Sequence, residues 1–268
     1  MTLSARLPVL LSLLATLTIT PSLEAQSTQR DTLRVQGLQK PVEIIRDRWG
    51  IAHIYASNEH DLFFAQGYNA AHDRLFQLEL WRRQATGTVA EILGPRELQR
   101  DIGTRLFMYR GDMQRELTSY HPHGVAIVGA FVEGVNAYID RAMRDPGSLP
   151  MEFRILGITP GKWTPAVVIS RHQGLLGNIG AELSLGRAVA QIGPDAVKRV
   201  SWFHPGDPVI ALDTAIDGSL LSQDILGVYN AFRQGVRFLP QDVNVAYRGD
   251  SAALGRLARI SDSLAADQ

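Results

Sequence analysis

The sequence predicts an α+β fold in which helices predominate. Two short segments on either side of a glycine turn, residues 42–45 and 51–56, have the length and apolar content of a β-hairpin. Farther along, apolar residues recur at steps of three and four over two long stretches, which is typical of amphipathic helices. The 268 residues suffice for one large domain or two small ones.

The hairpin is expected to begin the folded part of the chain. Its turn contains Gly50, which can take a positive φ at little steric cost. Because two strands alone are marginally stable in water, we expect the hairpin to join a larger sheet. His53 in the return strand is expected to be a hydrogen-bonded core histidine rather than a functional one.

A long helix should follow the hairpin. Ser57 or Asn58 can cap its first turn, and Asp61 then lies where a carboxylate meets the positive end of the helix dipole. Gly87 should end the helix. The apolar stripe expected to be buried consists of Phe64, Tyr68, Ala71, Leu75 and Leu78.

A second strong helix is predicted over residues 125–143, and Pro146 and Gly147 should stop it. Its inward-facing residues should be Val128, Phe131, Val135, Tyr138 and Ala142. Shorter helices are predicted over residues 166–176, 181–192 and 194–202. The last 25 residues or so can be helical, but they show no obvious core face.

Composition excludes several classes of function. Lys plus Arg and Asp plus Glu both total 27, so there is no basic excess to favour nucleic acid or an anionic membrane. The absence of cysteine removes disulfides, thiolate nucleophiles and cysteine-based zinc sites. It also fits a protein that is exported to an oxidising compartment.

The N-terminal residues have the pattern of a secretory signal peptide. Arg6 precedes an apolar stretch over residues 8–19, and Ala25 is a small residue at the expected cleavage point. We therefore expect residues 1–25 to be a signal peptide, residues 26–40 a polar lead-in, and the protein to be secreted or periplasmic, with no membrane attachment after removal of the signal. An uncleaved membrane anchor is the alternative.

Common catalytic motifs are absent from the sequence. It contains no G-x-S-x-G elbow, no H-E-x-x-H zinc helix and no phosphate-binding loop. Ser219 and Ser251 have no neighbouring histidine to activate them. His121 and His123 suggest a metal pair, but a solvated loop is the favoured interpretation because no third ligand or metal motif accompanies them.

One block of spaced residues resembles a known family. The block begins with Arg46-Asp47, Gly50 and His53 through Ala56. It continues with Gly67-Tyr68, Asp73 through Gln77, Arg82-Arg83 and Thr86 through Gly94. The later stretches of the pattern are Gly134 through Ile139, Phe153 through Trp163, Gly177-Asn178, Glu182-Leu183, Arg187-Ala188 and Trp202 through Pro208. This pattern resembles the α-chain of the penicillin amidase family of N-terminal-nucleophile (Ntn) hydrolases. The likeness covers about residues 42–210.

The resemblance implies a fold and a reaction. The whole enzyme is expected to have the four-layer αββα Ntn fold, made as a zymogen that cleaves itself into α- and β-chains. The nucleophile would be the serine that begins the β-chain, activated by its own α-amine, with an oxyanion hole on the same chain. The resemblance thus implies that this chain contributes no catalytic residue, has its own β-chain as partner and is inactive alone. Substrates would be small N-acyl amides, such as β-lactam side chains or N-acyl homoserine lactones, which links the protein to antibiotic resistance or quorum quenching.

The resemblance also implies two kinds of site residue. By motif position Glu182 is the carboxylate that the α-chain gives to a structural Ca²⁺ site shared with the β-chain, and the alternative is a surface pair with Arg187. His172, Leu175 and Leu176 precede that glutamate and are the candidates for lining the acyl pocket. For the two leucines, ordinary helix packing is the alternative.

Other charged motif residues are expected to be architectural. Glu79 can pair with Arg82 and Arg83, each pair contributing about 0.2–0.5 kcal/mol on an exposed helix. Buried or half-buried ion pairs that fix the hairpin to the first helix are expected among Arg46, Asp47, Asp73, Arg74, Glu79 and Arg83. Removing one partner of a buried pair costs about 3–5 kcal/mol. The resemblance also divides the chain. Residues 41–210 are the predicted α-chain, and residues 211–268 are predicted to contain the end of the α-chain and a spacer-like tail. The alternative from another class is a truncated, non-catalytic module that binds a partner.

Overall fold

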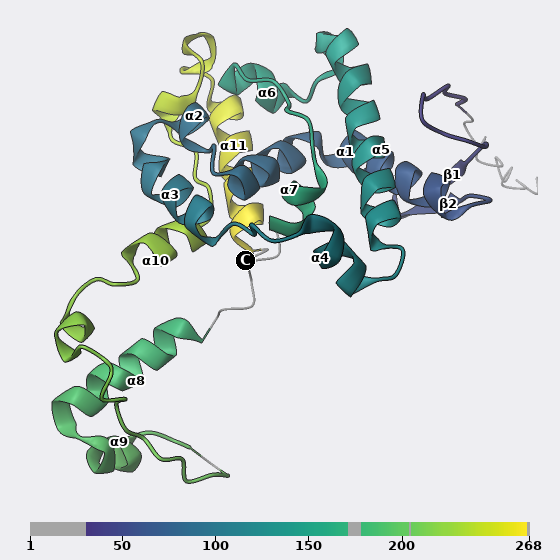
Figure 1. Cartoon of the computed structure of the whole chain (residues 1–268). Helices are drawn as coiled ribbons and strands as arrows, with labels where there is room; N and C mark the ends of the chain where they lie inside the picture. The colour runs from purple at the N-terminus through teal and green to yellow at the C-terminus, as the bar shows by residue number, and fades with distance from the viewer. Residues whose placement is uncertain (1–30, 171–177, 204, 267–268) are drawn as a thin grey trace, which may run out of the picture. The chain divides into compact units, whose positions relative to one another are not determined.

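The computed structural model describes residues 31–170, 178–203 and 205–266, with backbone alone for 263–266. The helices and strands lie in the compact unit that begins at Val35 (Figure 1). This unit is mostly helical, as the sequence predicts. Its shorter helices are α2 (Ala90–Leu93), α3 (Leu98–Phe107), α4 (Met113–Tyr120), α6 (Met151–Leu156), α7 (Pro165–Ser170), α8 (Ile179–Ile192), α9 (Pro194–Val200) and α10 (Gly227–Arg233).

The predicted hairpin forms. Strands β1 (Glu43–Arg46) and β2 (Ala52–Tyr55) pair antiparallel, with Ile44 opposite Ile54. Gly50 in the turn has a φ of +81°, which explains the glycine there. Within the described residues the sheet contains these two strands alone, so the larger sheet that we expected is not found there.

Helix α1 (Glu59–Thr86) is the first long helix and has the predicted ends. The Asn58 side chain caps it by accepting a hydrogen bond from the N–H of Asp61, and Gly87 ends it in the left-handed conformation. The backbone leaves helical geometry at Arg74, where the helix kinks. All five residues of the predicted apolar stripe are buried.

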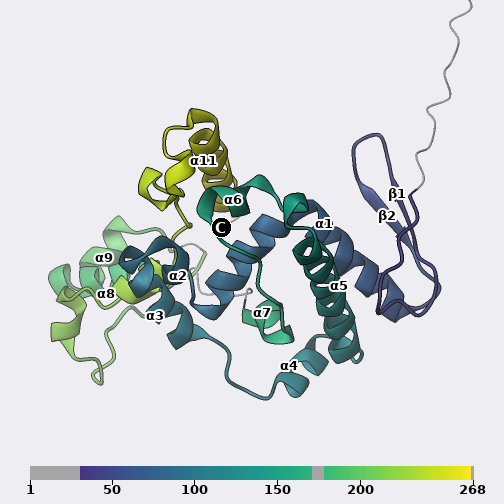
Figure 2. The same ribbon diagram turned by 90° about the horizontal axis from the view of Figure 1, so that it is seen from above.

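Helix α5 (Gly124–Arg144) packs along α1, and the two lie side by side in Figure 2. Glycines allow this close approach. A β-carbon at Gly67 would lie 2.0 Å from the carbonyl oxygen of Phe131, and one at Gly134 would lie 1.9 Å from that of Phe64. Neither position has room for a side chain, so the crossing requires glycine on both helices.

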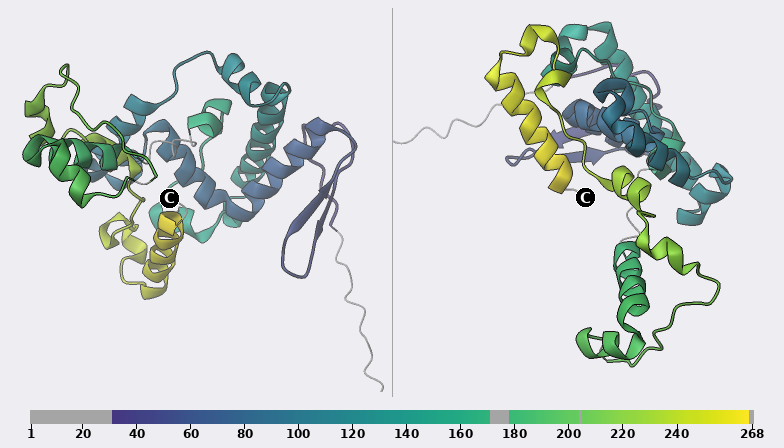
Figure 3. Two further views of the ribbon diagram at one scale, coloured as in Figure 1. Left: turned by 90° about the horizontal axis from the view of Figure 1, so that it is seen from below. Right: turned by 90° about the vertical axis from the view of Figure 1, so that its left-hand side faces the viewer.

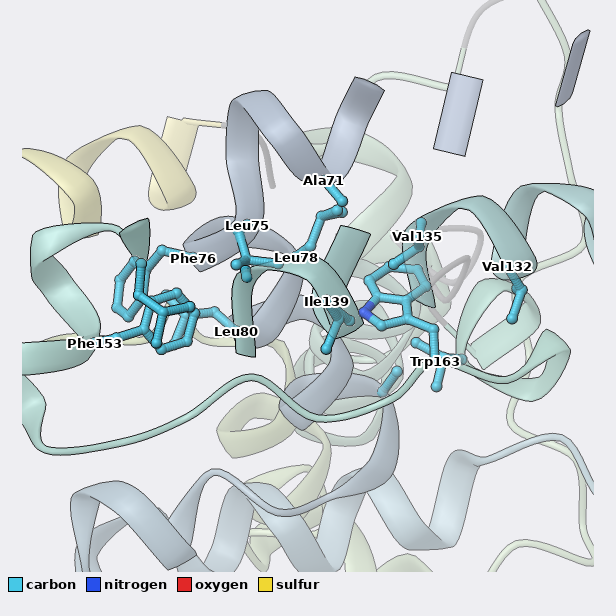
Figure 4. Close-up of a cluster of buried hydrophobic side chains, with 14 residues drawn as sticks. Ala71, Leu75, Phe76, Leu78, Leu80, Val132, Val135, Ile139, Phe153 and Trp163 are labelled. Atoms are coloured by element: carbon cyan, nitrogen blue, oxygen red, sulfur yellow. The ribbon is translucent and has the colours of Figure 1, made fainter. Parts of the chain in front are cut away.

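The main hydrophobic core lies between α1, α5, α6 and α7. Figure 4 shows the Trp163 indole beside Val135 and Ile139 of α5. The rings of Phe76 and Phe153 meet edge to face, with centroids 5.5 Å apart. Each large side chain that is fully buried here contributes about 1.5–3 kcal/mol relative to an exposed one. This core holds the motif-bearing helix α1 in place.

The C-terminal helix α11 (Ser251–Ala266) also has a core face, which corrects the sequence-based expectation. Ala253 and Leu257 are buried and pack with Ile155 of α6. Figure 3 draws α11 in yellow. Leu254 also packs on this cluster, and Ile260 packs on the main core. The expectation failed because these few apolar residues do not stand out in a helix that also has exposed alanines. The division of the chain at residue 210 stays a prediction.

The shorter predicted helices agree with the structure where it describes them. Helices α8 and α9 begin and end within two residues of the predicted bounds. Helix α7 covers the first part of predicted helix 166–176, whose last part lies outside the described residues. In the described part of the chain, no helix is both long and apolar enough to cross a membrane.

Candidate functional site

Glu182, the predicted calcium ligand, lies in the first turn of α8 with its side chain exposed. Its carboxylate accepts a hydrogen bond from the Asn178 side-chain amide. The alternative pair with Arg187 does not form, because that guanidinium donates to the carbonyl oxygens of Leu221 and Gln223 instead. Glu182 is therefore one accessible oxygen ligand that the described chain does not use in an ion pair.

The described residues do not assemble a complete metal site around Glu182. Among them, no three His, Cys, Asp or Glu side chains come close enough to hold a metal ion. Calcium requires six to eight oxygens, so further ligands would have to come from elsewhere. The three candidates for the acyl pocket, His172, Leu175 and Leu176, lie outside the described residues.

The best-formed polar site in the structure is centred on Glu79 of α1. Its carboxylate is fully buried and accepts hydrogen bonds from Arg82, at 2.7 and 2.9 Å, and from Arg83, at 2.7 Å. It also accepts one from the backbone N–H of Gly161, at 2.8 Å, which ties the segment before α7 to α1. The bonds to Glu79 raise the pKa of Arg82 above its usual range.

Burial of Glu79 decides between the two energies that the sequence allowed for these pairs. An exposed helical pair is worth a few tenths of a kcal/mol, but removing one partner of a buried pair costs about 3–5 kcal/mol. Arg83 extends the network by donating to the carbonyl oxygen of Thr88 and to Glu91, at 3.1 and 2.9 Å. The network fixes the loop after α1 as well as the helix itself.

A second network joins the hairpin to α1 through Arg46 and Asp73, two of the residues predicted for this role. Asp47 pairs within the hairpin, and Glu79 and Arg83 pair with each other, so these three do not fix the hairpin to the helix. Arg46 contacts Asp73 at 2.6 Å and Asn69 at 2.7 Å. Burial alone would raise the pKa of the Asp73 carboxyl, but hydrogen bonds from Arg46 and His72 outweigh it and hold that pKa below its usual value. The pair is half-exposed, so it orients the hairpin more than it stabilises the fold.

Two expectations about neighbouring residues are wrong. Arg74 is exposed at the kink of α1 and belongs to none of the ion pairs found among the described residues. His53 is exposed, not part of the core, and its Nε2 lies 3.3 Å from Asp47 within the hairpin. His53 is exposed because the two-stranded hairpin is covered by no further strand among the described residues.

Asp61 has a larger role than helix capping. Its buried carboxylate accepts hydrogen bonds from the backbone N–H groups of Gln39 and Lys40, at 2.9 Å each, and so anchors the lead-in to α1. Burial raises the pKa of Asp61, but these donors and the Asn58 amide lower it to about 2. His60 lies between Asp61 and Glu133 of α5, at 3.1 and 3.2 Å.

Two further anchoring residues were missed by the sequence analysis. Asp101 of α3 is buried and accepts from the N–H groups of Val89 and Ala90, which start α2. Asn136 of α5 exchanges hydrogen bonds with both backbone groups of Trp163, at 2.8 and 2.9 Å. Asn136 lies in the motif stretch Gly134 through Ile139. A polar side chain within an apolar helix face was therefore the signal that could have identified it.

His121, His123 and Ser219 lie at the surface. His121 and His123 are exposed between α4 and α5, and His123 contacts Glu59 at 2.9 Å. Ser219 lies in a short turn whose first N–H donors bond to Asp217, and it has no described histidine as hydrogen-bond partner. The described residues thus organise structure around α1 and show no nucleophile paired with a base.

Comparison with known proteins identifies the family. The model of the penicillin amidase family matches residues 41–246. A penicillin acylase 2 proenzyme from Pseudomonas sp. (strain SE83) is 31% identical over 243 residues, which are 88% of this chain and 31% of that protein. Penicillin G acylase from Escherichia coli is 36% identical over 138 residues, 51% of this chain and 16% of the relative.

A third relative has a different named substrate. Acyl-homoserine lactone acylase QuiP from Pseudomonas aeruginosa is 32% identical over 178 residues, 65% of this chain and 20% of the relative. The chain thus spans less than a third of the length of these three relatives.

A solved structure supports the same assignment. The thermostable penicillin G acylase from Alcaligenes faecalis matches with a TM-score of 0.52 and 26% identity, over 65% of this chain and 98% of the solved chain. The four-layer αββα arrangement stays a prediction, because the described residues form only helices and one hairpin. The sequence match over residues 41–246 and this shared architecture establish that the chain belongs to the penicillin amidase family.

Proposed function

We propose that this chain is the α-chain portion of a secreted N-acyl amide hydrolase. The observation that carries the proposal is the family match over residues 41–246, which includes the network around Glu79. In this proposal the α-chain organises the scaffold, and the reacting groups lie on a β-chain. The signal-like residues 1–25 support export to the periplasm or beyond the cell.

The proposed reaction proceeds through an acyl-enzyme ester. The hydroxyl of the serine that begins the β-chain attacks the amide carbonyl, and the α-amine of the same residue takes the hydroxyl proton. That proton passes to the leaving amine as the C–N bond breaks. Water then attacks the ester and releases the carboxylic acid, with oxyanion-hole donors stabilising both tetrahedral intermediates.

The substrate class follows from the names of the relatives. Two of them are penicillin acylases and a third acts on acyl-homoserine lactones, so all three names describe cleavage of an acyl group from an amine. We therefore propose small N-acyl amides as substrates, either β-lactam side chains or N-acyl homoserine lactones. His172, Leu175 and Leu176 remain the candidates for contacting the acyl group.

Glu182 is the proposed contribution of this chain to a structural calcium site. Its accessible carboxylate and the absence of an ion pair with Arg187 fit a hard-oxygen ligand. The remaining oxygens would come from the β-chain. In that role calcium would fix the position of α8 on the β-chain and take no part in bond cleavage.

The test uses the complete reading frame. We expect the protein encoded from Met1 through the downstream β-chain to hydrolyse penicillin G or an N-acyl homoserine lactone, and residues 1–268 alone to release no measurable amine. Metal analysis of the same preparation should find calcium, which Glu182→Ala reduces and the exposed control Asp195→Ala does not. Turnover that copurifies with residues 1–268 would contradict the assignment. A stop codon directly after Gln268 would instead favour the non-catalytic binding module.

A further inference from the structure

Two histidine–carboxylate contacts join the first turn of α1 to α5. The Nε2 of His60 lies 3.2 Å from Glu133 of α5. One residue earlier, Glu59 lies 2.9 Å from the Nδ1 of His123, the residue just before α5. In each contact a histidine on one side faces a glutamate on the other, but the two histidines have different surroundings.

His60 faces a carboxylate with each of its ring nitrogens. Its Nδ1 lies 3.1 Å from Asp61, and its Nε2 lies 3.2 Å from Glu133. An ionised carboxylate only accepts hydrogen bonds, and a neutral imidazole carries a single N–H. Both contacts can therefore be hydrogen bonds only when the His60 ring holds two protons and is positively charged. The contact between His123 and Glu59 requires one N–H, which a neutral ring also supplies.

The two carboxylates that hold His60 are not equivalent. The Asp61 side chain is fully buried and also accepts hydrogen bonds from the backbone N–H groups of Gln39 and Lys40 and from the side-chain amide of the helix cap. The Glu133 side chain is 60% exposed, so water can replace His60 as its donor. A buried acceptor loses more free energy than an exposed one when its donor leaves. A neutral His60 should therefore keep its single proton on Nδ1, toward Asp61, and lose the contact with Glu133.

The charges around His60 favour the protonated ring. Asp61 and Glu59 belong to its own helix, Glu133 faces it from α5, and the turn before α5 contributes His123, which contacts Glu59. The hydrogen bond to Asp61 raises the pKa of His60 above 6.5, burial opposes the rise, and Glu133 adds to it. The proton is therefore lost at a pH above 6.5, and the contact with Glu133 should open in that range.

We propose that the first turn of α1 is a proton-operated clamp, which a charged His60 closes between the lead-in, α1 and α5. In the closed state the His60 ring joins Asp61, which holds the lead-in, to Glu133 of α5. When the proton passes to solvent, the contact with Asp61 remains and the Glu133 carboxylate turns to water. This clamp does not depend on the proposed hydrolase activity.

Opening of the clamp should loosen the start of α1 and leave the core intact. The clamp lies beside the close crossing of α1 and α5, because Glu133 precedes Gly134 and the His60 ring stacks on that of Phe64, with centroids 6.1 Å apart. The crossing itself consists of glycines against backbone groups, which do not titrate in this range. Loss of one partly exposed contact should therefore increase local opening by about twofold to fivefold and cause no global unfolding.

The first experiment follows the His60 ring by NMR during a pH titration of residues 1–268, with His60→Gln to assign its signal. We expect Glu133→Gln to lower the midpoint of the His60 titration. The matched control is Glu59→Gln, which removes an equal charge one residue away but from a carboxylate that contacts His123. This control should lower the midpoint less. Equal shifts in the two variants would show that the summed charge of the first turn acts on His60, and would overturn the clamp.

The second experiment measures opening in the unaltered chain by amide hydrogen exchange, and so it stands even if a variant fails to fold. After correction for the intrinsic effect of pH, amides of residues 61–65 should exchange about twofold to fivefold faster at pH 8.5 than at pH 5.5. Amides of residues 135–139, in the core part of α5, should show no such change.

Variants assign this pH dependence to its contact. Glu133→Gln should give the faster exchange of residues 61–65 already at pH 5.5, whereas His123→Gln should retain the pH dependence of the unaltered chain. Exchange that does not change with pH in the unaltered chain would overturn the proposal. Loss of the pH dependence to the same extent in both variants would overturn it as well.

Discussion

Helices α1 and α5 differ from helices α8 and α9 in how they bury apolar surface. The first pair meets at two glycines, covers a contiguous core and places a charged carboxylate, Glu79, in its interior. The second pair buries just Val189 and Val197 among the described residues. Near its end, Val200 and Trp202 are 76% and 85% exposed.

The comparison indicates where stability resides and where association is expected. The α1–α5 pair buries its core residues against the described chain itself, so substitutions there should change the free energy of unfolding of residues 1–268. The α8–α9 pair leaves large apolar side chains in solvent, an arrangement that marks contact surfaces more often than free ones. Under the proposed function, the surface that covers it belongs to the β-chain. The following predictions test this difference.

The largest effect is expected for Glu79→Ala. It leaves the half-buried Arg82 and the buried Arg83 without their shared carboxylate and removes the acceptor for Gly161, so we expect a loss of about 3–5 kcal/mol in the free energy of unfolding. The measurement is urea denaturation followed by circular dichroism. Glu182→Ala on α8 is the matched control and should change stability by less than about 0.5 kcal/mol. Equal losses would remove the distinction between the two helix pairs.

A smaller effect is expected for Gly134→Ala. The new β-carbon would meet the backbone of Phe64 at 1.9 Å, so α1 and α5 must move apart, and overpacking of this kind costs about 1–3 kcal/mol. Gly129→Ala on the same helix is the control, because nothing lies within 4 Å of that position. Alanine also favours helix over glycine, so the control should gain up to about 1 kcal/mol. If Gly129→Ala loses as much free energy of unfolding as Gly134→Ala, contact with Phe64 is not the cause of the loss.

The smallest effect concerns His60 and depends on pH. Its hydrogen bond to Asp61 raises the pKa of His60 above 6.5, with Glu133 adding to the effect and burial opposing it. The stabilisation is therefore fully present below pH 6.5 and is lost as pH rises through the raised pKa of the folded state. We expect the difference in unfolding free energy between the unaltered chain and His60→Gln to shrink from pH 5.5 to 8.5.

The exposed Gln114 of α4, whose side chain has no titratable group, provides the control for that titration. Gln114→Ala should give a stability difference that does not change with pH over the same range. A difference for His60→Gln that grows with pH would reverse the sign and contradict the assigned interactions with Asp61 and Glu133.

The sequence by itself determined the local elements and the family. Gly50 and Gly87 marked a turn and a helix end because their positive φ values are costly for other residues. The steps of three and four in α1 named its buried stripe correctly, because helix geometry fixes which residues share a face. The block of motif residues led to the family because many residue types match at fixed spacing.

Only the tertiary structure decided which polar residues anchor the fold. Spacing could pair Glu79 with Arg82 and Arg83, but it could not show that the carboxylate is buried, since Gly161 lies 82 positions away. Arg100 reaches carbonyl oxygens 134 and 135 positions along the chain, and α11 gains its core face from α6. Burial and distant acceptors are properties of the folded chain: they depend on which segments meet, and a local pattern contains no information about its eventual neighbours.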